Sequence, residues 1–166
     1  MSNVSQNRAA PRALGHWLLK SEPDEFSIDA LAQCEVEPWS GVRNYQARNF
    51  MRDDMRAGDR VLFYHSSCAQ PSIVGLARVA SGAVPDPSQF DPQSEYFDQS
   101  SRPELPRWLQ IDIAFERKLR QPISLTVLRQ YAEPLQGLAL LNRGNRLSVM
   151  PVSREHFRLI LTLEPK

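Results

Sequence analysis

Cysteine pairs and metal-binding patterns are missing from this sequence. The two cysteines, Cys34 and Cys68, lie far apart, and the three histidines, His16, His65 and His156, show no metal-ligand spacing. A disulfide scaffold needs several paired cysteines, and a zinc site needs Cys or His ligands in close pairs. We therefore expect a reduced intracellular protein without a metal or another cofactor.

Long apolar runs are also absent. No stretch reaches the roughly 18 apolar residues that cross a membrane. The opening segment 1–15 lacks the apolar centre of a signal peptide. We expect 1–15 to be a flexible tail, with a short organellar presequence as the alternative, and 16–166 to be one domain. The expected location is the cytoplasm, or the nucleus in a eukaryote.

A strong net charge is absent too, because 20 Lys and Arg residues face 19 Asp and Glu residues and leave a net charge of +1. Such a chain has no overall field that drives attachment to nucleic acid, so any such binding must be local. Only Lys20, Lys118 and Lys166 are lysines. The many arginines favour forked contacts with phosphates and base edges, although ordinary surface charge explains the same bias.

Hydrophobic periodicity predicts a domain that mixes strands and helices. Strands are predicted at 16–20, 60–65, 73–84, 108–118 and 146–150. Helices are predicted at 28–33, 44–57, 125–131 and from 154 onward, each preceded by or beginning at a serine or asparagine that can cap it. Gly75 lies inside a predicted strand and indicates a bulge or a close backbone approach.

The predicted helix 44–57 has two faces. Residues at every fourth position share its polar face, which we interpret as exposed, with a stripe that follows a nucleic-acid backbone as the alternative. These residues are Asn44, Arg48, Arg52 and Arg56. The neighbouring apolar stripe is formed by Ala47, Met51 and Met55.

A long connection with five prolines runs from residue 85 to residue 106 and has no periodic pattern. Such a loop inside a small domain is usually functional or disordered. Its aromatic residues, Phe90, Tyr96 and Phe97, predict an ordered loop that folds back on the body.

The stretch Trp39–Asn49 combines a large flat ring, a glycine and several amide and guanidinium donors. A planar polar ligand stacks on such a ring and bonds the donors at its edge. We interpret Trp39 as the stacking residue, against the alternative of a core tryptophan. Asn44 either reads a base edge or caps the helix that follows. Lys20 and Arg43 either supply charge beside a base or phosphate, or form surface ion pairs.

Three polar residues, Tyr64, His65 and Ser66, lie at the end of a predicted buried strand and can reach the floor of a pocket. A catalytic pair of His65 and Ser66 has poor geometry, because adjacent strand residues point to opposite faces. Cys68 beside His65 is the enzymatic alternative, but no third group orients that pair. We therefore predict a binding protein without catalytic residues.

Five blocks of the sequence resemble the EVE domain. They are Trp17-Leu-Leu-Lys20-Ser21-Glu22-Pro23, the stretch Trp39–Asn49, Gly58-Asp-Arg-Val-Leu-Phe-Tyr64-His65-Ser66, Val74-Gly75-Leu-Ala and Arg146-Leu-Ser148-Val. The resemblance extends from about His16 to the terminal helix. It implies an α+β, PUA-like fold, in which a small mixed β-barrel or sheet is flanked by helices.

The same resemblance implies a role in nucleic-acid recognition. EVE domains resemble the YTH domain, which reads methylated adenine in RNA, and family members are associated with modified cytosines in DNA. Lys20-Ser21 and Trp39-Ser40 fall where the YTH pattern has its base-contacting turn and one aromatic wall. Tyr96, Phe97 and Trp108 are the candidates for the second wall.

The resulting hypothesis is a non-catalytic module that flips a modified base, a 5-substituted cytosine in DNA, into an aromatic pocket. An RNA-binding or RNA-processing accessory factor is the alternative. The expected partner is DNA or RNA, with neither a membrane nor an obligate protein partner. The candidate base-binding residues are Lys20, Ser21, Trp39, Ser40, Arg43, Asn44, Tyr64, His65, Ser66, Tyr96 and Ser148.

Overall fold

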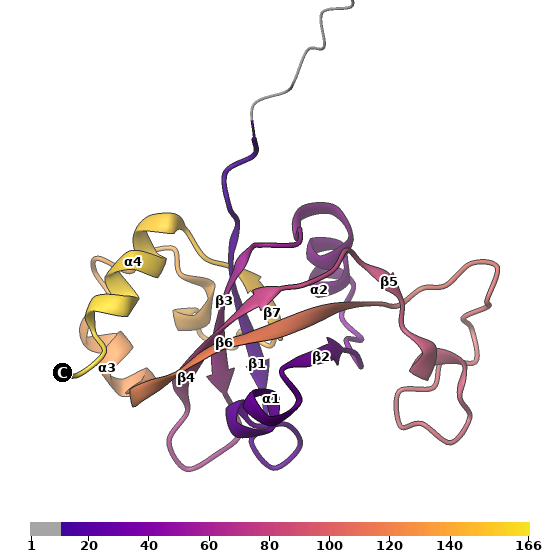
Figure 1. Ribbon diagram of the computed structural model, residues 1–166, viewed down its shortest axis with the longest axis horizontal. Helices are drawn as coiled ribbons and strands as arrows, with labels where there is room; N and C mark the ends of the chain where they lie inside the picture. Colours follow the sequence, from indigo (N-terminus) through magenta and orange to yellow (C-terminus); the bar gives the residue numbers. More distant parts are fainter. Residues whose placement is uncertain (1–10) are drawn as a thin grey trace, which may run out of the picture.

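The computed structural model describes residues 11–166. Its central element is a mixed sheet that curls into a half-barrel (Figure 1). Within these residues the strands are β1 (His16–Ser21), β2 (Val36–Trp39), β3 (Arg60–His65), β4 (Ser72–Val79), β5 (Val84–Pro85), β6 (Leu109–Ser124) and β7 (Val149–Pro151). The α-helices are α1 (Ile28–Cys34), α2 (Tyr45–Asn49), α3 (Leu125–Gln130) and α4 (Arg154–Thr162). The predicted α+β fold is thereby confirmed.

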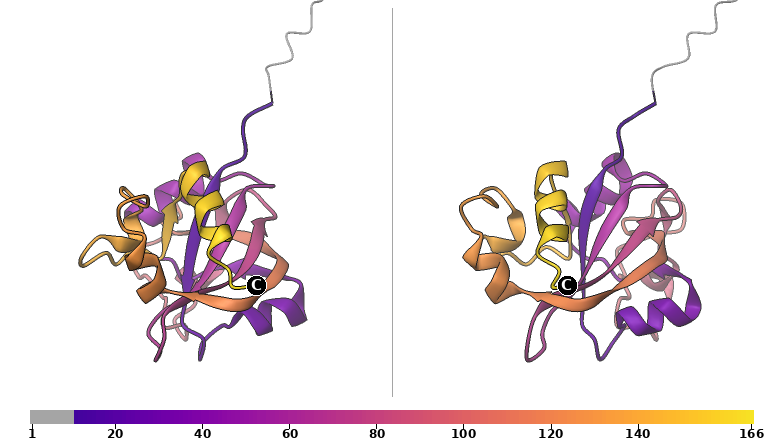
Figure 2. Two further views of the ribbon diagram at one scale, coloured as in Figure 1. Left: turned by 90° about the vertical axis from the view of Figure 1, so that its left-hand side faces the viewer. Right: turned by 60° about the vertical axis from the view of Figure 1, so that its left-hand side comes forward.

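The strand order is β2-β6-β4-β3-β1-β7, and β5 pairs with β6. β1 and β3 run parallel, whereas their other pairings are antiparallel. The parallel register sets Lys20 beside Tyr64 and Ser21 beside His65, so two strands end at the same edge of the sheet. β6 is 16 residues long and pairs with β5, β2 and β4. Its register shifts against β4 accompany the curl that Figure 2 shows.

Two hydrophobic cores fill the two faces of the sheet, because successive strand residues point in opposite directions. In β1, Trp17 and Leu19 belong to the first core and Leu18 belongs to the second. α1 and α2 contribute to the first core, and α3 and α4 contribute to the second. In α4, Phe157 and Ile160 are buried.

Gly75 lies at a β-bulge, as its position in the sequence indicates. Phe63 pairs with Gly75 and the next pair joins Tyr64 to Ile73, which leaves Val74 as the extra residue. A side chain at position 75 would also collide with α1. The bulge therefore changes which residues of β4 face each core, and the absence of a side chain at Gly75 lets α1 lie close to the sheet.

The strands differ from the predicted ones mainly in extent. The predicted strand 73–84 is two strands, and between them the Ser81 hydroxyl accepts the amide hydrogen of Asp112. β6 continues past Lys118 because its last residues pair with the start of β4. β7 begins at Val149 rather than at residue 146. The sequence does not predict β2, since its four residues include a proline, which an edge strand tolerates.

The predicted helix 44–57 is shorter and changes type. α2 passes directly into a π-helix, Phe50–Asp54, closed by a 2.9 Å bond from the Met55 amide to the Phe50 carbonyl. The helix therefore ends before Gly58, which follows in a left-handed turn with a φ of 93°. The predicted apolar stripe is buried, and it consists of Ala47, Met51 and Met55.

Asp59 is a buried carboxylate that fastens the segment before β1 to the body. It accepts hydrogen bonds from the backbone of Gly15 (2.8 Å) and Arg56 (3.0 Å) and from the indole of Trp17 (3.0 Å), and it pairs with Arg12. Burial by itself raises the pKa of Asp59, but these hydrogen bonds outweigh burial and lower it. Arg12 and Gly15 thus contact the body, and residues 1–10 of the predicted tail lie outside the described residues.

Replacing Asp59 with alanine should lower the free energy of unfolding by about 1–3 kcal/mol, because buried donors lose their acceptor. The folded pKa is depressed below 3.8, so the stability from this carboxylate is complete above pH 3.8 and lost as the pH falls through the folded value. The variant lacks that acid-dependent loss. Urea denaturation at neutral and acid pH measures both effects. Asp54→Ala, which removes an exposed carboxylate nearby, is the control, and an equal loss in both variants would contradict the role of Asp59.

Candidate functional site

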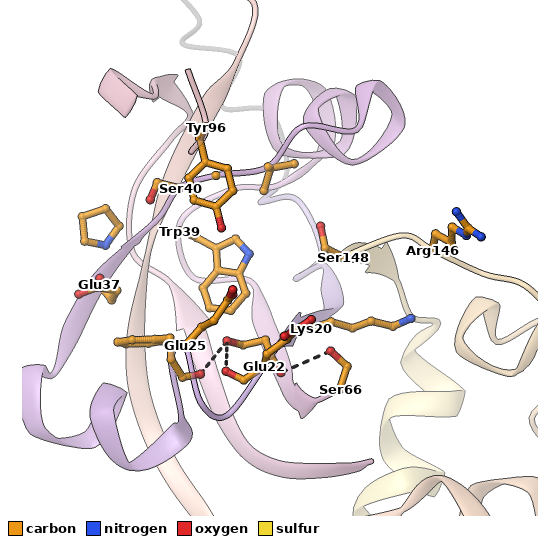
Figure 3. Close-up of a pocket in the computed structure, with 15 residues that line it drawn as sticks. Lys20, Glu22, Glu25, Glu37, Trp39, Ser40, Ser66, Tyr96, Arg146 and Ser148 are labelled. Carbon is orange, nitrogen blue, oxygen red and sulfur yellow. Dashed lines mark hydrogen bonds between the residues drawn. The ribbon is translucent and has the colours of Figure 1, made fainter. Parts of the chain in front are cut away.

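A cavity of about 450 Å³ lies where the ends of β1, β2 and β3 meet the chain that leads into β7 (Figure 3). We call it the aromatic cavity. Several predicted site residues line it, namely Lys20, Ser21, Trp39, Ser40, Ser66, Tyr96 and Ser148. Arg43, Asn44, Tyr64 and His65 lie outside its lining.

Trp39 is both a core residue and a wall of the aromatic cavity. Its side chain belongs to the first core, where the ring meets Phe63 edge-on at a centroid distance of 5.6 Å. Only 8% of Trp39 is exposed, so a small part of its ring surface faces the cavity. The two interpretations offered by the sequence therefore describe different parts of one side chain.

Phe26 and Tyr96 line the cavity together with Trp39, and Tyr96 is the one of the predicted candidates for the second wall that does so. Its ring packs against Gly41, where a Cβ atom would lie 2.8 Å from the ring and where the φ angle is 76°. Of the other candidates for this wall, Phe97 is exposed outside the cavity lining, and Trp108 stacks on Tyr45. A glycine at position 41 therefore permits the close approach of Tyr96.

Arg43 positions Tyr96 instead of lining the cavity. Its guanidinium donates two hydrogen bonds to the Tyr96 carbonyl (3.0 and 2.7 Å) and one to Asp86 (2.9 Å). Asp86 also accepts the Gly41 amide at 2.8 Å. Burial raises the pKa of Asp86, but hydrogen bonds from Ser88, Gly41 and Arg43 outweigh burial and lower it. Asp86 therefore stays ionised, and it binds both Gly41, against which the Tyr96 ring packs, and Arg43, which holds the Tyr96 carbonyl.

The long connection from residue 85 to residue 106 is ordered, as predicted. Gln89 joins its beginning to the residues that follow it. This fully buried amide accepts the backbone amides of Arg107 and Trp108 and donates to the carbonyls of Asp86 and Trp108. Asp86 and Gln89 are not among the residues predicted from the sequence. The available signal was Asp86-Pro87-Ser88, in which an acceptor followed by proline is typical of a capped helical turn.

A tight turn after β1 presents two carboxylates to the cavity. The Ser21 hydroxyl donates to the Phe26 carbonyl at 2.6 Å, and the Glu22 carbonyl accepts the amides of Glu25 and Phe26. The Ser66 amide donates to the Ser21 carbonyl at 2.9 Å. Ser21 and Ser66 thus shape the turn, while Glu22 and Glu25 lie below Trp39 in the view of Figure 3.

The cationic side chains of the cavity lie on a different side of it from Glu22 and Glu25. In Figure 3, Lys20, Ser148 and Arg146 lie to the right of Trp39. The Lys20 amide donates to the Ser148 carbonyl at 2.8 Å, which ties β1 to the chain before β7. Burial lowers the pKa of the Lys20 ammonium, which forms no ion pair with any carboxylate of residues 11–166. The cavity is therefore electrically divided.

Three predicted site residues outside the lining take structural positions. Asn44 caps α2, and its side-chain oxygen accepts the Ala47 amide at 3.0 Å. Tyr64 is buried in the second core, where burial raises its pKa to about 12. His65 accepts the Ile28 amide through Nε2 at 3.1 Å, at the start of α1. Burial lowers the pKa of His65, in agreement with a neutral ring at this position.

Residues 11–166 were also searched for metal-binding groups and for membrane-spanning helices. No group of three or more His, Cys, Asp or Glu side chains in this part of the chain is arranged to hold a metal ion. No helix in it is both long and apolar enough to span a membrane.

A curled mixed sheet with a cavity at its strand ends and helices on both faces is a PUA-like domain. A family model described as the EVE domain matches residues 15–163, so the chain belongs to the EVE domain family. The chain is 38% identical over 187 residues to human thymocyte nuclear protein 1, covering 99% of this chain and 82% of that protein. Identity to the mouse protein of the same name is 40% over 167 residues, covering 90% and 73%.

Solved structures support the same assignment. A crystal structure of a Pseudomonas putida protein matches with a TM-score of 0.87 and 46% identity, covering 90% of this chain and 99% of that one. The human THYN1 protein, crystallised in complex with DNA that contains 5-methylcytosine, matches with a TM-score of 0.87 and 38% identity, covering 92% and 98%. The family and the PUA-like fold predicted from the sequence are confirmed.

Replacing His65 with glutamine should flatten the pH dependence of stability. The folded pKa of His65 lies below 6.5, so its contribution is complete above pH 6.5 and falls as the pH drops from 6.5 toward the folded value. Glutamine offers an acceptor to the Ile28 amide without titrating, so the variant should lose less stability than the wild type between about pH 7.5 and about pH 5. Urea denaturation at both pH values measures the difference.

His156→Gln is the control for that experiment, because the His156 side chain accepts no helix amide. It should keep the wild-type pH dependence. If His65→Gln also keeps it, then His65 is not the acceptor of the Ile28 amide in solution.

Proposed function

We propose that this protein is a non-catalytic DNA-binding module that reads a 5-substituted cytosine flipped from a duplex into the aromatic cavity. The observation that carries this proposal is the presence of Trp39 and Tyr96 in the wall of one cavity that also offers carboxylates and an ammonium group. The human THYN1 complex with DNA containing 5-methylcytosine supports the same class of ligand for this relative.

The size and energetics of the cavity suit one nucleotide base. Its volume of about 450 Å³ lies within the range of small-molecule sites, about 300–1,000 Å³. Flipping a base costs a few kcal/mol, and stacking on an aromatic side chain returns about 1–3 kcal/mol. Trp39 is mostly buried in the core, so Tyr96 has to supply much of the stacking surface. Hydrogen bonds to the base edge supply the rest.

The acidic side of the cavity favours cytosine. Cytosine carries an amino donor at N4, where thymine carries a carbonyl acceptor, and carboxylates accept from that amino group. Glu22 and Glu25 are the carboxylates nearest to such a role, and Lys20 is a donor for the acceptors of the same base. Burial, followed by the charge of Glu25, raises the pKa of Tyr96, so its hydroxyl stays protonated and can donate.

The surroundings of His65 support a binding role over catalysis. The Nε2 lone pair of His65 accepts the Ile28 amide, so it is not free to remove a proton. The thiol of Cys68 contacts the His65 carbonyl at 3.9 Å instead of the ring. The pair that the sequence offers as an enzymatic alternative therefore lacks a general base.

Replacing Tyr96 with alanine should weaken binding to DNA containing 5-methylcytosine by about 1–3 kcal/mol, roughly 5- to 150-fold, because stacking is lost. Phe97→Ala removes an adjacent, exposed ring and should bind as the wild type does. Fluorescence anisotropy with labelled duplexes, modified and unmodified, measures both, and structured RNA serves as competitor. Trp39 is a poorer choice, because removing a core tryptophan costs about 3–5 kcal/mol of stability. Stronger binding to RNA, or equal binding to both duplexes, would overturn the proposal.

Replacing both Glu22 and Glu25 with alanine should reduce the preference for 5-methylcytosine over thymine. The two bases share the methyl group and differ at position 4, so the comparison isolates the amino group. We expect the wild type to prefer 5-methylcytosine by about 1–3 kcal/mol, and the double variant to lose most of that preference. Mispaired duplexes that differ only in this base provide the measurement. Glu95→Ala, which changes an exposed carboxylate outside the cavity lining, is the charge control.

A further inference from the structure

A second cavity, of about 470 Å³, lies beside the aromatic cavity and is lined by residues 44, 46, 139 and 142–147. We call it the amide cavity, because Asn44, Gln46 and two further asparagines line it. Arg146 lines both cavities. Figure 3 shows the Arg146 guanidinium directed away from Trp39, so its charge lies on the side away from the base-stacking wall. A strand whose base fills the aromatic cavity would therefore pass Arg146.

The two cavities differ in charge. Three carboxylates line the aromatic cavity, whereas no acidic side chain lines the amide cavity. Arg143 and Arg146 form no ion pair or side-chain hydrogen bond within residues 11–166, so their donors are available. The side-chain oxygen of Asn44 accepts the Ala47 amide, which leaves its NH₂ group for a ligand. A cationic site with amide donors and no carboxylate suits a phosphate oxygen.

The backbone that carries these arginines is held in place. The Asn145 side chain donates to the Ala139 carbonyl at 2.6 Å and accepts the Leu147 amide at 2.8 Å. Gly144 adopts a left-handed conformation with a φ of 73°, which lets the chain turn between Arg143 and Arg146. The two guanidinium groups therefore project from an ordered turn, which lowers the entropic cost of engaging a ligand.

We propose that the amide cavity binds a phosphodiester group of the DNA strand whose base enters the aromatic cavity, with Arg143 and Arg146 as the principal donors. The position of that phosphate beside the flipped nucleotide rests on the proposed function. The affinity of the amide cavity for phosphate does not rest on the proposed function, because contacts with the DNA backbone carry no base information. Base reading and backbone binding are thereby divided between a cavity that contains carboxylates and one that contains none.

The experiment compares wild type, Arg143→Ala and the control Arg120→Ala on an unmodified duplex over a series of salt concentrations. Arg120 is exposed and lines neither cavity. Losing one phosphate contact should reduce the slope of log affinity against log salt by about 1 and weaken binding about tenfold near 50 mM salt. The variant should keep the wild-type ratio of affinities for modified and unmodified DNA. Arg120→Ala should change neither quantity.

A second arm replaces single phosphates near the modified cytosine with neutral methylphosphonates. Wild type should lose affinity at one position, and Arg143→Ala should lose nothing further there, because the two changes remove the same contact. An unchanged salt slope in Arg143→Ala, or a lost preference for the modified base, overturns this inference. If Tyr96→Ala keeps the full preference for modified DNA while Arg143→Ala shows the reduced salt slope, the proposed base reading fails and the phosphate site stands. Absence of any DNA binding at low salt overturns both.

Discussion

The buried ion pair of Asp86 and Arg43 is the interaction on which the aromatic cavity depends. Asp86 accepts the Gly41 amide and the Arg43 guanidinium, and Arg43 in turn holds the Tyr96 carbonyl. Because Asp86 is fully buried, removing the Arg43 charge leaves a carboxylate without its ion-pair partner in a low-dielectric interior. Segments more than forty residues apart are thus joined at the point where Tyr96 meets the chain after Trp39. The cavity wall owes its shape to a group that lies outside the cavity.

Strand topology supplies the other walls. The parallel pairing of β1 with β3 ends both strands at one edge, which sets the turn after Ser21 beside Ser66. The chain before β7 joins the same edge through the bond between Lys20 and Ser148. Backbone hydrogen bonds of the sheet therefore decide which polar side chains share a cavity. They place the carboxylates after β1 in the aromatic cavity, whereas the amide cavity is lined by two arginines and no carboxylate.

Local patterns predicted much of the fold. Ser27, Ser124 and Ser153 cap helices where expected, because capping needs only a side-chain oxygen and a helix amide three residues later. β2 and the exact type of the helix after Asn49 escaped prediction, because an edge strand with a proline and a π-turn both depend on tertiary partners. The resemblance to the EVE domain pointed to Lys20, Ser21 and Trp39, which line the cavity. Tyr64 and His65 looked equally suitable, but Tyr64 is buried in the second core and the His65 ring accepts the first amide of α1.

The sequence by itself determined the family, the fold class and the helix caps, and it indicated an irregularity at Gly75, since each rests on neighbouring residues or ordered motifs. Only the tertiary structure decided which aromatic ring joins Trp39 and which arginines are free. Tyr96, Phe97 and Trp108 are alike as letters, and Arg43 and Arg143 carry the same charge. Their positions differ because Asp86 binds the Arg43 guanidinium, which in turn holds the Tyr96 carbonyl, whereas no carboxylate of residues 11–166 pairs with Arg143.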